Sequence, residues 1–443
     1  PFERFLNPER PAVPDIDIEI CPSCRPAVLE HLRERHGRDR VAHIITFGTF
    51  GARMAIRDTG RALGVAPSAC DAVARRVPEG SDMTLARALR TRPDFRREAD
   101  TACAPDLLPM AQAFEGLPRS PGTHPTGVVV ADRPLVELVP LARGGDGETV
   151  TQYDMRDLAW AGLLKIDLPG LRVLTVLDEA VRSLRAGGSA VVLADLPEDD
   201  PATLALIGRG DTAGVALLDA PSAREAARRM GVGRFEDLVA LVALHRPEAA
   251  ALFDEAVARK SGAAPSDAPH KRLAGLLRET HGLLLYQEQI PAAAAALAGM
   301  SPEKGDLLRR ALVARDDDTM HRHLAAFVEG CRRTHHIRPD DASRLAGLLE
   351  SCGRYGLSRA HAVAAAKLAY RGAWLKAHHP VEFLAAAMSN EAGDPGRLAA
   401  LLAEARALGI RVLGPDVNRS SAGFVPEGRA IRFGLAGDRK SVV

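Results

Sequence analysis

Acidic residues alternate with isoleucines over residues 14–20, and this short segment is the part of the chain best suited to chemistry. Alternation with a period of two is typical of a β-strand with one apolar face. On such a strand Asp15, Asp17 and Glu19 project to one side, about 7 Å apart, while the isoleucines, Ile18 among them, turn into the core. Like charges on one face repel, and a bound cation usually offsets that cost. The pattern indicates a divalent-metal site, with a solvated edge strand as the alternative.

A second alternating run, at residues 162–168, places Lys165 and Asp167 on one face of a predicted strand. Neighbouring strands lie about 4.8 Å apart, so a strand next to the first acidic run would bring a further carboxylate to the same site. Asp167 would then complete a two-ion site with Asp15 and Asp17. The distance along the sequence leaves this pairing as a hypothesis.

Three arginines, Arg53, Arg57 and Arg61, recur every four residues in a segment with a helical pattern, residues 51–63. Such a stripe forms a basic ridge along one face of a helix. Asp58 is the only acid close by in the sequence that would balance it. The ridge is either a solvated face or a surface beside a phosphate-rich ligand.

Beyond residue 170 the pattern is almost entirely helical, and polar side chains cluster where helices should pack. They do so in three segments, residues 286–289, 307–310 and 355–361. The adjacent Arg309 and Arg310 are suited to phosphate oxygens through charge-assisted forks. The alternative is that they form salt bridges with nearby acids such as Asp306.

The composition favours a helix-rich globular protein with more than one domain. The chain has 443 residues, 46% of them hydrophobic and 4% aromatic, with a formal charge of +1, so an anionic partner must be held by local patches. Six cysteines without framework spacing favour reduced thiols, and Cys21 and Cys24 match only half of a zinc knuckle. No apolar run of membrane-spanning length occurs, which predicts a cytosolic protein. Both ends read as cut points within a longer sequence.

Several ordered motifs resemble one family. Residues 2–10, followed by Pro14-Asp15-Ile16-Asp17, resemble the palm of the alpha subunits of bacterial DNA polymerase III. The resemblance covers nearly the whole chain to about residue 435, through residues 44–49, 56–58, 123–130, 164–167, 170–172, 286–289, 307–311 and 374–378.

The resemblance implies an α+β, predominantly helical fold. Its palm sheet would be related to the polymerase-beta nucleotidyltransferases, with an inserted helical thumb and a large helical fingers region. The implied domains are residues 1–58 for the first part of the palm, 59–120 for the thumb, 121–172 for the second part of the palm, 173–390 for the fingers, and 391–443 for the truncated start of the little-finger and helix-hairpin-helix region.

The implied function is DNA-directed DNA polymerase. In the family two magnesium ions are held by residues that correspond to Asp15, Asp17 and Asp167. The incoming nucleotide would be lined by Lys165, Arg309, Arg310, Tyr355, Arg359 and His361. Primer–template DNA and deoxynucleoside triphosphates would be the substrates. A sliding clamp and other replisome subunits would bind through regions absent from this sequence, and no membrane is involved.

This sequence departs from the family pattern mainly around the nucleotide. Phe-Asn-Lys-Ser-His is replaced by residues 357–361, Leu-Ser-Arg-Ala-His, and Leu-Glu-Ser by Leu218-Asp219-Ala220. A basic tail is replaced by the acidic residues 316–318. A degenerate, non-catalytic paralogue that binds primed DNA or replication partners is therefore the alternative function, and a metal-dependent nuclease ranks third.

Overall fold

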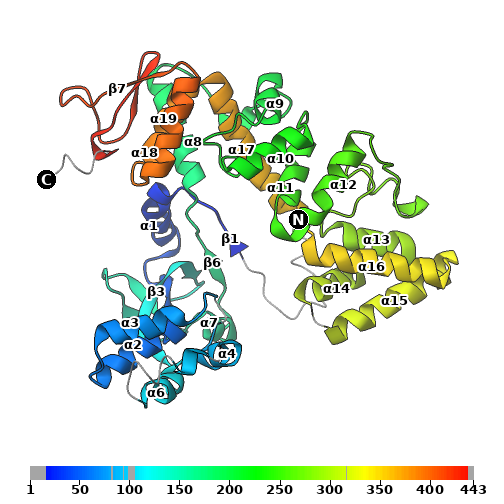
Figure 1. Cartoon of the computed structure of the whole chain (residues 1–443), viewed down its shortest axis with the longest axis horizontal. Coiled ribbons are helices and arrows are strands. Elements are labelled where there is room, and N and C mark those ends of the chain that lie inside the picture. The colour runs from blue at the N-terminus through cyan, green and yellow to red at the C-terminus, as the bar shows by residue number, and fades with distance from the viewer. Residues whose placement is uncertain (1–15, 81–82, 93, 98–104, 316, 438–443) are drawn as a thin grey trace. The chain divides into compact units, whose positions relative to one another are not determined.

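The computed structural model describes residues 16–80, 83–92, 94–97, 105–315 and 317–437 (Figure 1). These residues form two compact units. The first, called the sheet unit, consists of residues 16–20 and 24–170, and the second, called the helical unit, consists of residues 21–23 and 171–437. The predicted fold class, α+β and predominantly helical, is confirmed.

A mixed sheet with the strand order β1-β6-β3-β2-β5-β4 is the centre of the sheet unit. Its strands are β1 (Ile16–Asp17), β2 (Val41–Thr49), β3 (Pro118–Val130), β4 (Leu141–Arg143), β5 (Thr149–Thr151) and β6 (Lys165–Asp167). β2 and β3 form the long antiparallel pair at its centre, where β-branched residues favour extended backbone. β1 lies parallel to β6 at the edge. The strands of the two acidic runs are therefore neighbours.

The first acidic strand is shorter than its alternation predicts. β1 contains only Ile16 and Asp17, and Ile20 adds a single bridge to Gly170. Ile18 was expected in the core, but it is 50% exposed. That expectation is wrong because β1 is an edge strand of two residues, so the regular burial of alternate side chains ends with it.

Helices cover both faces of the sheet. The helices described in this unit are α1 (Arg25–His36), α2 (Ala52–Ala62), α3 (Pro67–Arg76), α4 (Leu85–Thr91), α6 (Leu107–Phe114) and α7 (Met155–Trp160). Leu29 of α1 packs with Val128 on one face. Leu158 of α7 packs with Ile44 and Val129 on the other. Val128 and Val129 therefore pack on opposite faces of the sheet, because successive side chains of a strand point to opposite sides.

The helices α2, α3, α4 and α6 gather into one helical insertion between β2 and β3 (Figure 1). Their buried residues include Ile56 of α2, Val73 of α3, Leu85 of α4 and Leu107 of α6. The chain enters and leaves this insertion at one place, because Thr49 and Pro118 are register partners. The domain boundary proposed between residues 58 and 59 falls inside α2, which packs with the insertion from Ala52 onward.

The helical unit is built from long helices and one small sheet. Its helices are α8 (Arg172–Ala186), α9 (Pro201–Gly208), α10 (Pro221–Met230), α11 (Phe235–Leu244), α12 (Ala250–Lys260), α13 (Gln289–Ala298), α14 (Pro302–Ala314), α15 (Asp317–His335), α16 (Pro339–Tyr355), α17 (Arg359–His378), α18 (Pro380–Asn390) and α19 (Pro395–Ala407). Many of them begin with proline, whose fixed φ suits the first helical position. The sheet pairs β7 (Arg411–Leu413), β9 (Ala430–Arg432) and β8 (Val425–Glu427) in that order.

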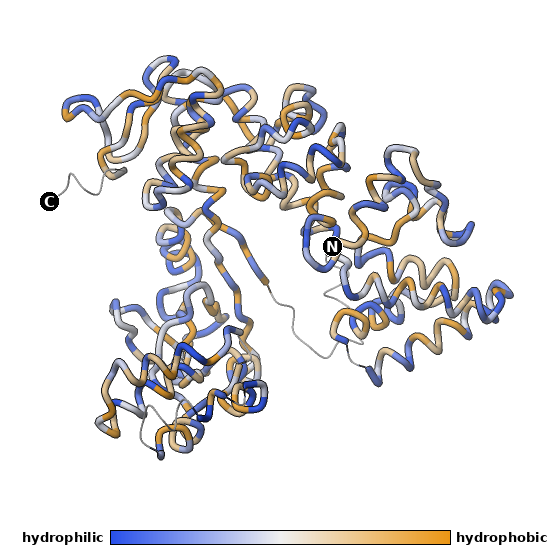
Figure 2. Tube along the Cα trace, viewed as in Figure 1, coloured by the Kyte–Doolittle hydropathy of each residue, from blue (hydrophilic) through white to orange (hydrophobic). Residues whose placement is uncertain are grey.

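Two apolar cores hold the helical unit together. The larger surrounds α17, where the small residues Ala362, Ala366 and Ala369 are fully buried and allow neighbouring helices to approach closely. The smaller joins α13 to α16. Figure 2 shows hydrophobic and hydrophilic residues alternating in short bands along these helices, as amphipathic helices require.

The segment from residue 391 onward belongs to the larger core. Leu398 of α19 and Ile431 of β9 are buried in the same cluster as α17. The structure therefore joins the described part of the proposed last domain to the unit before it. No helix among the described residues is both long and apolar enough to cross a membrane.

Candidate active site

Two of the three predicted metal ligands lie on neighbouring strands. Asp17 of β1 and Asp167 of β6 are register partners in the parallel pair, and the Ile18 amide donates to the Asp167 carbonyl oxygen at 2.8 Å. Register partners project from the same face of a sheet, about 4.8 Å apart at the backbone. The sheet therefore presents two carboxylates side by side. Asp15 lies outside the described residues, and Glu19 is exposed.

The Asp167 carboxylate is buried and held by two donors. Thr126 on β3 donates its hydroxyl to Oδ1 at 2.9 Å, and Lys165 donates from Nζ to Oδ2 at 2.5 Å. Burial raises the pKa of Asp167, but these hydrogen bonds and the charge of Lys165 lower it by more. The pKa therefore lies below its ordinary value, and the group is an anion at neutral pH. Lys165, predicted to line the nucleotide, contacts this acid.

His124 is positioned against the same acid. Its Nδ1 accepts a hydrogen bond from the Gly127 amide at 2.7 Å and lies 3.8 Å from Asp167 Oδ1. Gly127 is required at this point, because an added Cβ would lie 2.8 Å from His124 Nδ1. Neither His124 nor Thr126 was predicted from the sequence to belong to the site. The signal that would have found them is the Thr-His-Pro-Thr-Gly run at residues 123–127, directly before the apolar end of β3.

The basic ridge on α2 is paired with acids and carbonyls of its own unit. Arg57 forms an ion pair with Asp71 of α3 at 2.6 Å, and Arg61 pairs with Asp58 at 2.7 Å. Arg53 donates to the Val77 carbonyl oxygen at 2.7 Å. Asp58 is therefore not the only balancing acid, because Asp71, distant in sequence, is brought alongside by the packing of α3.

In the helical unit the three polar segments come together in space. Tyr286 and Leu357 form a parallel bridge, and the Gln287 amide donates to the Leu357 carbonyl oxygen at 3.0 Å. Arg309 of α14 donates to Gln287 Oε1 at 3.3 Å. We call this group, residues 286–288, Arg309 and residues 355–359, the fingers cluster.

The two adjacent arginines of α14 differ in environment. Arg309 is buried, with 8% exposure, and forms an ion pair with Asp306 at 2.8 Å. Arg310 is half-buried. The structure thus contains the salt bridge that was the alternative to phosphate binding for the first arginine.

The other predicted nucleotide contacts lie at the end of α16 and the start of α17. Tyr355 donates its hydroxyl to the Leu284 carbonyl oxygen at 2.7 Å, and burial raises its pKa. Arg359 is exposed and donates to Glu279 at 2.7 Å. His361 is exposed on the first turn of α17. Sequence reasoning missed Glu279, which lies 80 residues before its partner.

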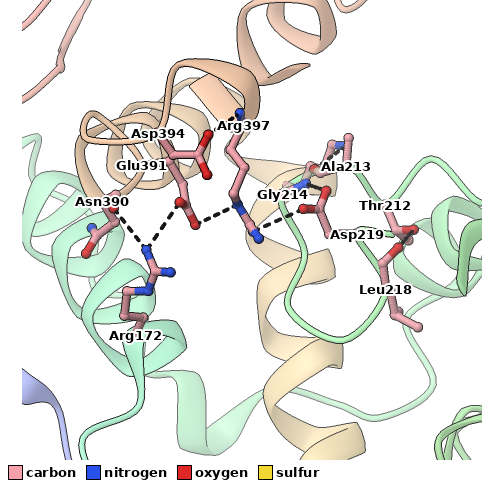
Figure 3. A network of polar contacts seen from close by, with 11 residues as sticks. Arg172, Thr212, Ala213, Gly214, Leu218, Asp219, Asn390, Glu391, Asp394 and Arg397 are labelled. Carbon is pink, nitrogen blue, oxygen red and sulfur yellow. Dashed lines mark hydrogen bonds and ion pairs between the residues drawn. The ribbon is translucent and has the colours of Figure 1, made fainter. Parts of the chain in front are cut away.

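A second polar network explains one departure from the family pattern (Figure 3). Asp219 accepts a hydrogen bond from the Gly214 amide at 2.7 Å and forms an ion pair with Arg397 of α19 at 3.2 Å. Arg397 also contacts Glu391, which pairs with Arg172 of α8. Asp219 therefore stabilises the loop of residues 214–219 and connects it to α19 through Arg397.

Comparisons with known proteins agree with the division into two units. Residues 1–170 match the family model described as the bacterial DNA polymerase III alpha NTPase domain. Residues 173–335 match the bacterial DNA polymerase III alpha subunit finger domain. A sheet unit with paired aspartates and a helical unit with clustered arginines thus correspond to two consecutive parts of one class of polymerase subunit.

Whole-chain similarity points the same way. The chain is 40% identical to DNA polymerase III subunit alpha of Thermus aquaticus, 38% to that of Caulobacter vibrioides and 37% to that of Bacillus subtilis. These matches cover 98%, 99% and 98% of the chain but only 36%, 39% and 39% of the respective relatives. The chain belongs to the bacterial DNA polymerase III alpha family, and it spans little more than a third of these relatives' length.

Proposed function

We propose that this chain is part of a DNA-directed DNA polymerase that adds deoxynucleotides to a primer 3′-hydroxyl on a DNA template. The observation that carries the proposal is the register pairing of Asp17 with Asp167. It places two carboxylates on one face of a sheet, in a chain whose relatives are named DNA polymerase III subunit alpha. Primer–template DNA and deoxynucleoside triphosphates are the proposed substrates.

The donor set fits magnesium. Carboxylate oxygens are the ligands that Mg²⁺ prefers, and Asp167 is kept ionised by its hydrogen-bond donors. Asp17, Asp167 and the preceding acid, Asp15, would hold two ions. Bound there, the ions would favour ionisation of the primer hydroxyl and neutralise charge on the triphosphate.

The protein's own groups would prepare this site. Thr126 fixes the orientation of the Asp167 carboxylate from β3 by donating its hydroxyl to Oδ1. Lys165 offsets the charge of that carboxylate, and its ammonium would also be a suitable donor to a phosphate oxygen of a nucleotide bound beside Asp167. Arg310, Arg359 and His361 supply positive or donor groups for the triphosphate, and Arg309 and Tyr355 support them from the interior.

A non-catalytic paralogue remains the second candidate because several predicted contacts are paired internally. Arg57, Arg61 and Arg309 each form an ion pair with an acid of their own unit. Such a protein would bind primed DNA and incorporate nothing. Asp317 and Asp318 on α15 would also repel a phosphate backbone.

The test measures primer extension and DNA affinity on the same full-length parent protein. Asp17→Asn and Asp167→Asn should each lower extension by about 10³-fold or more, since metal-ion stabilisation contributes several kcal/mol. DNA affinity should change little. Asp71→Asn, which removes an exposed acid of the same unit, is the matched control and should retain extension. Full extension by either site variant would refute the metal assignment, and a wild-type parent that binds DNA without extending it would favour the paralogue.

A further inference from the structure

Glu288 joins two helices of the fingers cluster that are distant in sequence. It directly precedes α13, yet its carboxylate reaches the start of α17. Oε1 accepts a hydrogen bond from the Ser358 hydroxyl at 2.8 Å, and Oε2 accepts one from the Arg359 amide at 2.8 Å. A glutamate from another segment therefore satisfies the first amide of α17.

This contact replaces the usual local cap. Ser358 occupies the N-cap position of α17, where a serine normally accepts a hydrogen bond from its own helix. Here Ser358 accepts no such hydrogen bond, and its hydroxyl donates to Glu288 instead. The carboxylate also lies at the positive end of the helix dipole, which favours an anion. The start of α17 is thus determined by Glu288.

Neighbouring contacts reinforce the connection. The backbone amide of Gln287 donates to the Leu357 carbonyl oxygen at 3.0 Å. The side-chain amide of the same residue donates from Nε2 to the Gly356 carbonyl oxygen at 2.9 Å. Consecutive residues before α13 therefore bind consecutive residues before α17. The two segments form one rigid connection from which Arg359 projects.

The Arg359 side chain is guided by the same segment. Its guanidinium lies 5.9 Å from the centre of the Tyr286 ring and donates to Glu279 at 2.7 Å. Burial of Tyr286 makes its ring a fixed platform, and cation–π contact favours this placement of the cation. Backbone and side chain of Arg359 are therefore both oriented by residues 279–288.

We propose that Glu288 is a positioning residue, which fixes the first turn of α17 so that Arg359 is directed at the triphosphate of the incoming nucleotide. This inference rests on the polymerase function proposed above. Glu288 acts through Arg359 and makes no contact with substrate. Its loss should weaken nucleotide binding more than it slows the chemical step.

Steady-state kinetics of the full-length parent test this role. Glu288→Ala should raise the nucleotide KM about tenfold, equivalent to the loss of one charge-assisted hydrogen bond, with kcat within about twofold. Glu288→Gln keeps one acceptor oxygen and should restore part of the loss. Glu350→Gln, which removes an exposed ion pair with Arg354, is the control and should behave as wild type.

A double variant and hydrogen exchange separate positioning from general stability. Glu288→Ala in an Arg359→Ala background should add almost nothing to the KM, because the two residues act in series. The amides of residues 359–361 should exchange about tenfold faster in Glu288→Ala than in the control variant. Glu288→Gln provides the same readout should the alanine variant fail to fold.

Three results would overturn the inference. They are an unchanged KM, a fall in kcat alone, and additive effects in the double variant, since none of these is expected of a residue that acts on nucleotide binding through Arg359. Failure of the polymerase function is distinguishable, because it would appear in the wild-type parent as DNA binding without incorporation.

Discussion

The acids of the sheet unit and the bases of the fingers cluster are held in place by different means. Asp17 and Asp167 are fixed by strand register, which sets their separation through the backbone. Arg309 and Arg359 extend from helices on long side chains and are fixed by partner acids, Asp306 and Glu279. Where backbone register sets the separation of two carboxylates, a longer or shorter side chain displaces the carboxylate from its position. An ion-paired arginine, in contrast, can exchange its partner carboxylate for another anion. Precise chemistry suits the first arrangement, and binding and release suit the second.

The largest expected contrast comes from conservative substitutions at the two sites. Asp17→Glu lengthens a register-held ligand by one methylene and should lower kcat of the full-length parent about 10²-fold, since misplacement by 1 Å has effects of that size. Arg359→Lys keeps the charge and should raise the nucleotide KM by no more than about tenfold. Equal losses in kcat for both variants would remove the distinction between the two sites.

A buried ion pair offers the largest expected change in stability. Lys376 is 2% exposed and donates to Glu404 at 2.6 Å and to the carbonyl oxygens of Asp211 and Ala213 at 2.8 and 2.9 Å. Lys376→Met should lower the free energy of unfolding by about 3 kcal/mol, because it leaves a carboxylate uncompensated.

The matched control is an exposed lysine on the same helix. Lys367 pairs with Glu198 at 2.8 Å, and both side chains are 46% exposed. Lys367→Met should change the free energy of unfolding by less than about 1 kcal/mol. Urea denaturation of the two variants measures the difference, and equal effects would show that burial does not determine the contribution of ion pairs in this unit.

The pH dependence of the sheet unit tests the Lys165–Asp167 contact. Because the pKa of Asp167 is lowered by folding, its contribution is present above the unfolded pKa, about 3.9, and is lost as the pH falls through the folded value. Lys165→Met should raise the Asp167 pKa and lower the free energy of unfolding at pH 7 by about 1 kcal/mol.

Urea denaturation at pH 7 and pH 3 measures this effect. The difference between wild type and Lys165→Met should be largest at pH 7 and smaller at pH 3, because pH 3 lies below the pKa of the unfolded carboxyl, about 3.9. Arg61→Met, which removes an exposed pair with Asp58, is the control. A deficit that is independent of pH would contradict the role of Asp167.

The smallest expected effect concerns the α2 ridge. Arg57→Ala removes an exposed pair with Asp71 and should leave the urea midpoint of unfolding nearly unchanged. If Asp71 occupies Arg57 permanently, DNA affinity and its dependence on salt should be unchanged. A salt slope lower by about one would instead identify Arg57 as a phosphate contact.

Local patterns predicted much of the sheet unit. Alternation identified the acidic strands and placed Lys165 and Asp167 on one face, because side-chain direction in a strand depends on the backbone alone. The burial of Ile18 was wrong, since the pattern does not reveal that β1 ends after two residues at the edge of the sheet. The second alternating run supplied the hypothesis that the two acidic strands are neighbours, and the observed strand order matches it.

Asp306, three residues from Arg309, was named from the sequence as its partner, but the partners that lie far along the chain were beyond sequence reasoning. Glu288 lies 70 residues from Ser358, and Asp71 lies 14 residues from Arg57 on another helix. Such contacts depend on tertiary packing, which determines which of many acids is close. Residue type predicted that the arginines would be functional, but only the structure shows what each one contacts.

The pairing of Thr49 with Pro118 has a consequence for how this protein can change over time. The helical insertion is attached to the sheet at two adjacent residues, so its size is independent of the strand register that aligns Asp17 with Asp167. Lengthening, shortening or exchanging the insertion leaves both ends of the attachment where they are. This junction therefore accepts insertions of different length or fold, in evolution or by engineering. The sheet face that carries Asp17 and Asp167 is not changed by them.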